Sequence, residues 1–426
     1  MSYTPYPPSP HTATRWQIFS WALFDFAHTA FYVIILTVGY PLYFKEIVAQ
    51  GSNRGDLLWG SAFSISMLIV ALFSPILGAV ADYGAGKKRF LGILTAICVL
   101  ATSSLFFVHT GMIFLGMALL IISNIGFEAG LVFYDAFLPE ITTIRSYGRV
   151  SGYGFSLGYV GSLVSLSVVF PLYAGGFVAG NLFNIQLSFI VAAAFFFVFA
   201  LPLFFFLPDK QRTRSLKLDF IKVGFARLRT TYQQFPKYRN VARFLISYFI
   251  YIDGVNTIII FSSIFARETL KMDIGEIVIY FAMVQTSAIF GSVLFGILAD
   301  HTTHKRTLSI TLCLWLSIVV IAFFIQDKWM FYGLGVLAGL ALGSSQSTSR
   351  GLMSIITPQE KKTEFFGFYS FFGKASAVLG PFVFGFISSY LNQRFAILSV
   401  GFFLLTGLIL LQQVEERTPE SSISTP

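Results

Sequence analysis

Residues 184–207 read NIQLSFIVAAAFFFVFALPLFFFL and contain no charged side chain. A helix needs ~20 apolar residues to cross a bilayer, because the hydrocarbon core is ~30 Å thick and holds no water to satisfy exposed backbone groups. This stretch therefore predicts a membrane-spanning helix.

Further stretches of the same kind occupy most of the chain. Composition agrees with them, since 55% of the residues are hydrophobic, 12% are charged and the mean hydropathy is +0.74. We expect an all-α membrane protein with twelve transmembrane helices. The predicted spans cover residues 17–44, 57–81, 90–108, 112–134, 150–172, 184–207, 244–265, 276–298, 307–325, 330–349, 364–389 and 395–413.

The basic residues lie mainly on one side of these spans. The formal net charge is +9, and most Lys and Arg, including Arg350 just after the tenth span, fall on the side that both termini share. The opposite side holds only Lys45, Arg54, Arg267, Lys271, Lys328 and Arg394. Because basic loops are retained in the cytoplasm, we expect cytoplasmic termini and a location in the plasma (inner) membrane. The bias explains the charge, so nucleic acid is not an expected partner.

A basic segment separates the sixth span from the seventh. We divide the chain into an N-terminal bundle of six helices (1–207), a cytoplasmic linker (208–243) and a C-terminal bundle of six helices (244–426). Apolar residues recur in the linker at helical spacing among basic ones, which is typical of an amphipathic helix in the lipid interface. They are Ile221, Phe225, Leu228 and Tyr232. Membrane lipids are therefore expected partners.

The two halves repeat each other. Gly78 and Asp82 end the second span before a basic loop, and Gly296 and Asp300 end the eighth span in the same way, about 220 residues later. Internal repeats of this kind are typical of transporter folds. We therefore expect the two bundles to be pseudo-symmetric. Similar offsets relate Asp25 to Asp253, and Gly152 to Gly367.

With these duplicated loops on six plus six spans, the chain resembles the major facilitator superfamily of secondary transporters. Four segments are similar to one branch of it, the fungal vacuolar amino-acid effluxers linked to autophagy and their bacterial relatives. They are Trp21–Asp25, Phe137–Glu140, Gly148–Gly154 and Phe365–Tyr369. The resemblance implies the major facilitator fold and amino-acid efflux by alternating access.

The resemblance also implies a gate at the cytoplasmic mouth. In the superfamily, the glycine of this loop lets helices approach closely, and the acidic and basic groups link helix ends and hold the outward-facing state. Here these positions are Gly78, Asp82, Lys88, Arg89, Gly296, Asp300, Lys305 and Arg306. The positive-inside rule alone would also place basic residues in these loops. The repeated Gly and Asp favour the gate.

Four charged residues lie deep within predicted spans. A charge at the bilayer centre costs at least ~2.5 kcal/mol, so each is a functional candidate facing a cavity. They are Asp25, Glu128, Asp253 and Lys374. Spans one, four and seven, which resemble the cavity-lining helices of the superfamily, supply the three acids. A poorly hydrated carboxylate can take up a proton and release it to water on the other side of the membrane, so we expect proton coupling.

Polar side chains accompany these acids. His28 follows Asp25 on the same helical face, Asn124 and Asn256 lie near Glu128 and Asp253, and Gln346 belongs to a polar run in the tenth span that either lines the cavity or bonds to neighbouring helices. The alternative for the charges is a structural ion pair of Lys374 with Asp25 or Asp253 that never titrates. We expect Glu128 to act in coupling or cargo contact, since its span holds no basic residue at that depth.

Three cargo or function hypotheses remain open. Acids with one lysine suit a small zwitterionic solute, with Lys374 meeting a carboxylate and Asp25 or Asp253 meeting an amine, so we expect export of an amino-acid-like molecule. A lipid-like or amphiphilic cargo is the first alternative. The second is a membrane sensor or assembly protein that binds a ligand without moving it.

No enzyme, cofactor or metal site is predicted. The nearest thing to a phosphate loop, residues 84–88, has Ala81 in place of the first glycine of a Walker motif and Lys88 in place of its Ser or Thr. His301 and His304 are more simply solvated loop residues than metal ligands. Nothing implies an oligomer, and we expect a monomer.

Overall fold

The computed structural model describes residues 13–51, 55–80, 86–208, 238–358, 361–376, 383–384, 387, 390 and 393–416. Apart from short connections, these residues are helical. The first half begins with α1 (Arg15–Phe31), which continues through the π-helical turns η1 (Tyr32–Thr37) and η2 (Phe44–Val48) on either side of α2 (Gly39–Tyr43). The following α-helices are α3 (Gly55–Val80), α4 (Lys87–Ser104), α5 (Ile113–Asp135), α6 (Leu138–Ile141), α7 (Tyr147–Val169) and α8 (Leu182–Phe206). Short 3-10 turns lie between them: η4 (Leu105–Phe107), η5 (Ile144–Ser146), η6 (Phe170–Tyr173) and η7 (Ala179–Asn181).

The second half repeats this order. Its helices are α10 (Arg239–Glu268), α11 (Ile274–His301), α12 (His304–Phe324), α13 (Lys328–Ile356), α14 (Lys362–Ala375) and α16 (Gln393–Gln412).

Each predicted span coincides with one of these helices, although the eleventh, residues 364–389, is described only in part. Within the described residues, ten helices are long and apolar enough to cross a membrane by themselves. Helix α13 is not among them, since its sequence mixes Gly, Ser and Gln residues with the apolar ones, and α14 is described over only 14 residues. The expected all-helical membrane fold is confirmed.

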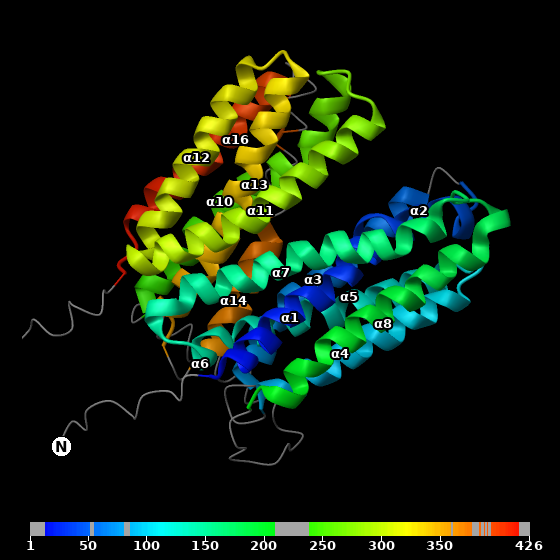
Figure 1. Ribbon diagram of the computed structural model, residues 1–426, viewed down its shortest axis with the longest axis horizontal. Coiled ribbons are helices and arrows are strands. Elements are labelled where there is room, and N and C mark those ends of the chain that lie inside the picture. The colour runs from blue at the N-terminus through cyan, green and yellow to red at the C-terminus, as the bar shows by residue number, and fades with distance from the viewer. Residues whose placement is uncertain are drawn as a thin grey trace, which may run out of the picture.

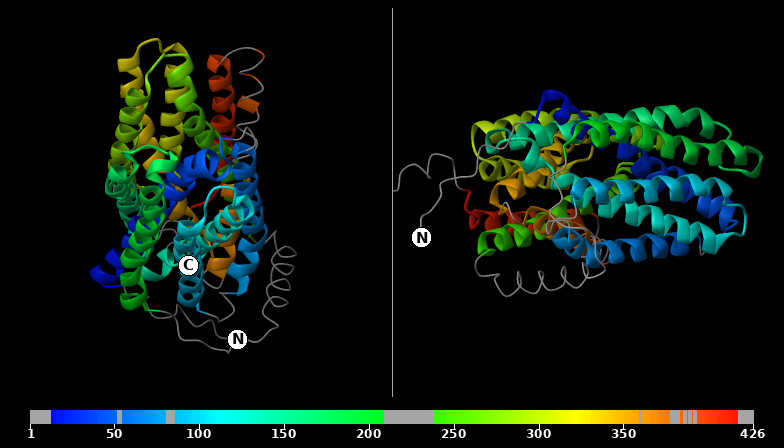
Figure 2. Two further views of the ribbon diagram at one scale, coloured as in Figure 1. Left: turned by 90° about the vertical axis from the view of Figure 1, so that its right-hand side faces the viewer. Right: turned by 90° about the horizontal axis from the view of Figure 1, so that it is seen from below.

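The helices form two groups that meet at one end and diverge at the other (Figure 1). They meet where α6 and the lower end of α14 lie, close to both described ends of the chain, and they diverge toward the end that carries α2. Figure 2 shows the same two groups from the side and from below.

Glycines hold the halves together along two seams, one between α7 and α11 and the other between α3 and α14. A Cβ atom added to Gly152 would lie less than 3.0 Å from the carbonyl oxygen of Ser292, and one added to Gly367 would lie equally close to that of Ser74. Real Cβ atoms essentially never approach other atoms so closely. Gly152 and Gly367, like Ser74 and Ser292, are separated by about 220 residues, so the repeat seen in the sequence builds two equivalent seams.

Buried apolar side chains fall into two clusters. Among the described residues, one runs from Trp21 to Leu207 and the other is centred on the second half, from Val241 to Val414. The division into two bundles and a linker stays a prediction, because the amphipathic helix expected around Ile221 to Tyr232 lies outside the described residues.

Candidate functional site

A buried arginine of the second half lies among acidic residues of the first half. Arg350 on α13 is only 1% exposed. Both of its terminal nitrogens lie 3.4 Å from Oδ2 of Asp25 on α1, and Nη1 donates to Oδ1 of Asp135 on α5 at 3.1 Å. Its Nε and Nη2 donate to the hydroxyl and the carbonyl oxygen of Ser151 on α7 at 2.9 and 2.8 Å. All three nitrogens of this guanidinium therefore contact the other half.

Aromatic rings and a glycine complete the surroundings of this guanidinium. It lies 3.9 Å from the centre of the Phe155 ring and 4.9 Å from that of Trp21, distances at which the negative face of a ring attracts a cation. Gly154 is needed beside it, because a Cβ there would lie less than 3.0 Å from both Asp25 and Arg350.

Both carboxylate oxygens of Asp25 have further hydrogen-bond partners. Its Oδ1 lies 2.8 Å from Nε2 of His28, and Tyr134 donates its hydroxyl to Oδ2 at 2.7 Å. The predicted proximity of His28 to Asp25 is confirmed. Two carboxylates share one guanidinium, so the cluster holds an excess negative charge unless His28 or a carboxyl group carries a proton. The side chain of Asp135 is 23% exposed and that of Asp25 only 6%, so water reaches Asp135 more readily.

A second ion pair joins the halves. Nζ of Lys374 on α14 lies 3.1 Å from Oε2 of Glu128 on α5, with side chains 11% and 12% exposed, and it also donates to Ser370. The alternative of a structural ion pair between Lys374 and Asp25 or Asp253 is wrong, because the ion pair of Lys374 is with Glu128 and Asp25 pairs with Arg350. The span of Glu128 holds no basic residue at that depth, and its basic neighbour comes from α14 of the other half.

The remaining polar candidates occupy separate places. Asn124 donates to the Ser66 hydroxyl at 2.7 Å and so bonds α5 to α3. Gln346 accepts a hydrogen bond from Tyr159, which links α13 to α7 across the halves. Asp253 is buried on α10 at 1% exposure, and Asn256 is half-buried one turn further along.

Sequence reasoning missed Arg350, Asp135, Tyr134 and Ser151. The apolar run ends just before Arg350 and so predicts a place on the cytoplasmic side, yet α13 continues to Ile356 and Arg350 is buried. The signal was present: neither a glycine cap nor a proline stands between Ser344 and Arg350, so nothing ends the helix there.

The gate positions are only partly linked across the halves. Both carboxylate oxygens of Asp300 accept backbone N–H groups at the start of α7, from Gly148 at 2.8 Å and Arg149 at 3.0 Å. Gly78 and Gly296 make close backbone contacts with Thr363 and Gly148 of the opposite halves. Asp82 lies outside the described residues.

Two of the basic gate residues form hydrogen bonds within their own half. Lys88 donates to the carbonyl oxygen of Leu207 at 2.6 Å and Lys305 to that of Gln412 at 2.7 Å, each within its own half, while Arg89 and Arg306 are exposed. The basic group beside Asp300 is Arg149, whose Nε lies 3.4 Å from Oδ2.

Known proteins are similar to this chain in sequence and in fold. A family model described as "Vacuole effluxer Atg22 like" matches residues 60–146 and 140–420. An uncharacterized MFS-type transporter of Bacillus subtilis, YxiO, is 31% identical over 407 residues, which cover 94% of this chain and 95% of that protein. The chain belongs to the Atg22-like family. Autophagy-related protein 22 of Yarrowia lipolytica is a more distant relative, 23% identical over 84% of this chain and 76% of its own length.

Solved structures share the fold of this Atg22-like chain. The human organic anion transporter MFSD10 superposes with a TM-score of 0.73 at 15% identity, covering 96% of this chain and 100% of that one. The transporter FucP in its outward conformation gives a TM-score of 0.73 at 14% identity, covering 94% and 99%. The chain is therefore a secondary transporter of the major facilitator superfamily and a multi-pass integral membrane protein, and the resemblance noted from the sequence is confirmed.

Proposed function

We propose that the chain exports a small zwitterionic solute of the amino-acid type and couples this movement to protons. The observation that carries the proposal is the ion pair of Glu128 and Lys374. It joins α5 of one half to α14 of the other at 3.1 Å, and both side chains keep some exposure. A rocking motion of the halves around a central site must separate such a pair.

A zwitterion is the solute that suits this separation. When the pair opens, a buried carboxylate and a buried ammonium are each left without a partner, which is costly. An amino acid carries both complementary charges, so its carboxylate can bind Lys374 and its ammonium Glu128. Glu128, and not Asp25, meets the amine of the solute, because the oxygens of Asp25 already bind His28, Tyr134 and Arg350.

The cluster around Arg350 supports proton coupling. With both carboxyl groups ionised and His28 neutral, Asp25, Asp135 and Arg350 together carry an excess negative charge at low exposure, and a proton taken up there removes the excess. Asp135 is the natural entry point because its side chain is the more exposed carboxylate. Protonation weakens the hold of Asp135 on Arg350 and so loosens a contact between the halves.

The shape supports an outward-facing state, given cytoplasmic termini as the basic residues predict. The halves meet at the end where both described chain ends lie and diverge at the other (Figure 1), and the similar FucP structure is described as outward. The export direction rests on the effluxer description of the family.

The test is transport of radiolabelled amino acids by the purified full chain in liposomes, with and without a pH gradient. Glu128→Gln and Lys374→Gln should each lower counterflow by about tenfold or more, since each leaves a charge unpaired. Glu276→Gln is the matched control, because Glu276 pairs with Lys328 at 2.8 Å within one half, and it should transport like the parent. Parental counterflow in Glu128→Gln would refute the zwitterion site.

The coupling arm uses Asp135→Asn in the same assay. This variant should retain counterflow but lose accumulation driven by the pH gradient. Gradient-driven accumulation equal to the parent's would remove Asp135 from coupling. Ligand binding without flux would favour the sensor hypothesis, and flux restricted to amphiphiles would favour the lipid-like cargo.

A further inference from the structure

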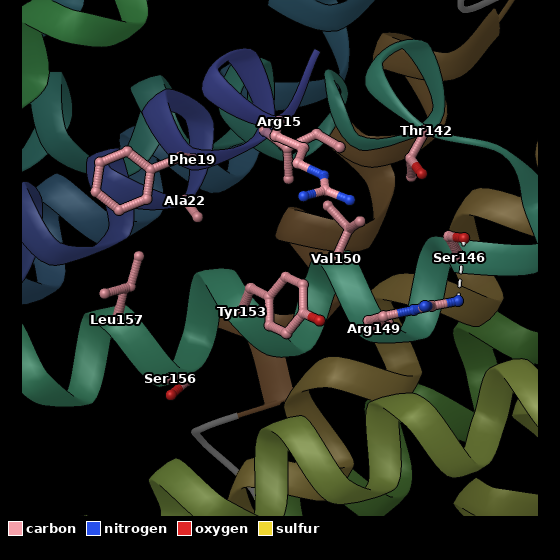
Figure 3. Close-up of a pocket in the computed structure, with 11 residues that line it drawn as sticks. Arg15, Phe19, Ala22, Thr142, Ser146, Arg149, Val150, Tyr153, Ser156 and Leu157 are labelled. Atoms are coloured by element: carbon pink, nitrogen blue, oxygen red, sulfur yellow. Dashed lines mark hydrogen bonds between the residues drawn. The ribbon is translucent and has the colours of Figure 1, made fainter. Parts of the chain in front are cut away.

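A cavity of about 620 Å³ opens between α1 and α7, and none of the candidate transport residues lines it. One wall carries Arg15, Phe19 and Ala22 of α1, and the other carries Arg149, Tyr153 and Leu157 of α7. Figure 3 shows the two walls facing each other. Both arginines belong to the first turns of their helices, so the cavity begins at the end of the molecule where the halves meet.

The cavity changes from basic to apolar with depth. At 1.5 Å per residue, Ala22 lies ~10 Å beyond Arg15 and Leu157 ~12 Å beyond Arg149 along their helices. The arginines therefore stand at the level of lipid headgroups, and the apolar side chains below them stand at the level of the first acyl carbons. Phe19 is 46% exposed, so the cavity is open to the surrounding lipid.

The cavity itself supplies no counter-charge to the two arginines. None of the residues that line the cavity is acidic, and Arg15 is exposed without a side-chain partner in the described part of the chain. Arg149 pairs with Asp300 through its Nε at 3.4 Å, yet its side chain stays 43% exposed. Asp300 already accepts two backbone N–H groups, so it does not depend on this guanidinium.

We propose that the cavity binds an anionic phospholipid of the cytoplasmic leaflet. Its phosphate lies between Arg15 and Arg149, and one acyl chain follows Phe19 and Leu157 into the membrane. The side that both termini share carries most of the basic residues and is the cytoplasmic one, where anionic lipids are enriched. Arginine forms paired hydrogen bonds to phosphate. This proposal does not depend on the identity of the transported solute.

The experiment counts bound phosphatidylglycerol on the detergent-purified full chain by native mass spectrometry. The variants are Arg15→Gln, Arg149→Gln and their combination. Each substitution should weaken phosphatidylglycerol binding roughly fivefold, and the double variant by more. The matched control is Arg145→Gln with Arg306→Gln, which removes the same charge from exposed residues of that side outside the cavity and should bind like the parent.

Two further measurements distinguish a phospholipid from a free phosphate compound as the ligand. Phosphatidylcholine should bind more weakly than phosphatidylglycerol, and glycerol 3-phosphate without acyl chains should not compete at equal concentration. Parental binding by the double variant would overturn the proposal, as would equal loss in the control pair or full competition by glycerol 3-phosphate. Arg15→Gln leaves the Asp300 contact in place, so it remains informative if the Arg149 variant fails to fold.

Discussion

Gly154 is the residue on which the contact between Asp25 and Arg350 depends. A Cβ at this position would lie less than 3.0 Å from an oxygen of Asp25 and a nitrogen of Arg350, and 3.2 Å from the ring of Trp21. None of these groups is the free end of an exposed side chain, since Trp21, Asp25 and Arg350 are all buried. The glycine therefore leaves space for a charge pair and is not needed for a backbone turn.

We predict that Gly154→Ala destabilises the protein by about 1–3 kcal/mol, the usual cost of overpacking a buried site, and that it lowers transport. Gly158→Ala one turn further on is the control, because its added Cβ would have no neighbour closer than 3.5 Å. Thermal unfolding in detergent and liposome counterflow measure the two effects. Equal stability of the two variants would mean that the charge pair tolerates displacement.

At this scale the sequence allowed local predictions but not distant ones. The proximity of His28 to Asp25 follows from a spacing of three on one helix and is confirmed at 2.8 Å. The pairing of Lys374 with Glu128 was not predictable, because it depends on how two separate bundles face each other. Arg350 was not predicted as buried, because the polar residues just before it look like the end of a span, whereas α13 continues beyond them.

Asp300 acts at the scale of a helix. Helix α7 begins at Tyr147 without a side-chain cap from its own chain segment, and its first N–H groups bond to Asp300 of the opposite half. The carboxylate satisfies orphan donors and meets the positive end of the helix dipole. A helix cap thus becomes a contact between halves that must break when this end opens.

We predict that Asp300→Ala costs about 1–2 kcal/mol of cap energy and shifts the protein toward states open at this end. Cysteines engineered there, in a background without Cys98 and Cys313, should react faster with a water-soluble maleimide. Asp327→Ala is the control, since Asp327 caps α13 within one half and its loss should leave labelling unchanged. Unaltered labelling in the Asp300 variant would show that this cap does not hold the mouth closed.

Glu416 caps another helix and gives a pH-dependent prediction. Burial opposes its ionisation, but hydrogen bonds from His304 and from the backbone N–H groups of Lys305 and His304 outweigh burial and hold its pKa below the ordinary 4.5. His304 is thus buried, not solvated as expected from the sequence.

Because the folded state lowers the pKa of Glu416, its contribution to stability is present above about pH 4.5 and is lost as pH falls through the lowered value. Glu416→Gln should therefore unfold at a lower temperature than the parent at pH 7, and the difference should shrink below about pH 4.5. Thermal unfolding between pH 7 and pH 4 measures this. A difference that stays constant over the whole range would contradict the role of the charge.

At the scale of the whole molecule, the sequence predicted the architecture because two physical rules act on long segments. Hydrocarbon thickness sets the length of each span, and the repeat of Gly78 and Asp82 at Gly296 and Asp300 predicted two related halves. The angle between the halves could not be read from these rules, since it depends on which side chains meet along the seams. The role of Gly152 and Gly367 in those seams emerged only from the structure.

The seams yield the last prediction. Gly152→Ala and Gly367→Ala each place a Cβ against the backbone carbonyl of Ser292 or Ser74, and a backbone carbonyl on a packed helix cannot move aside alone. We predict that each variant separates the halves where they now meet, increases maleimide labelling at that mouth and lowers transport.

Gly60→Ala on α3 and Gly333→Ala on α13 are the matched controls, because an added Cβ at either has no neighbour within 4 Å. The two seams are pseudo-equivalent, so the Gly152 and Gly367 variants should have effects of similar size. A large effect at one seam with none at the other would contradict this equivalence. It would mean that the seam without an effect stays closed throughout the motion, and that the halves rock about it.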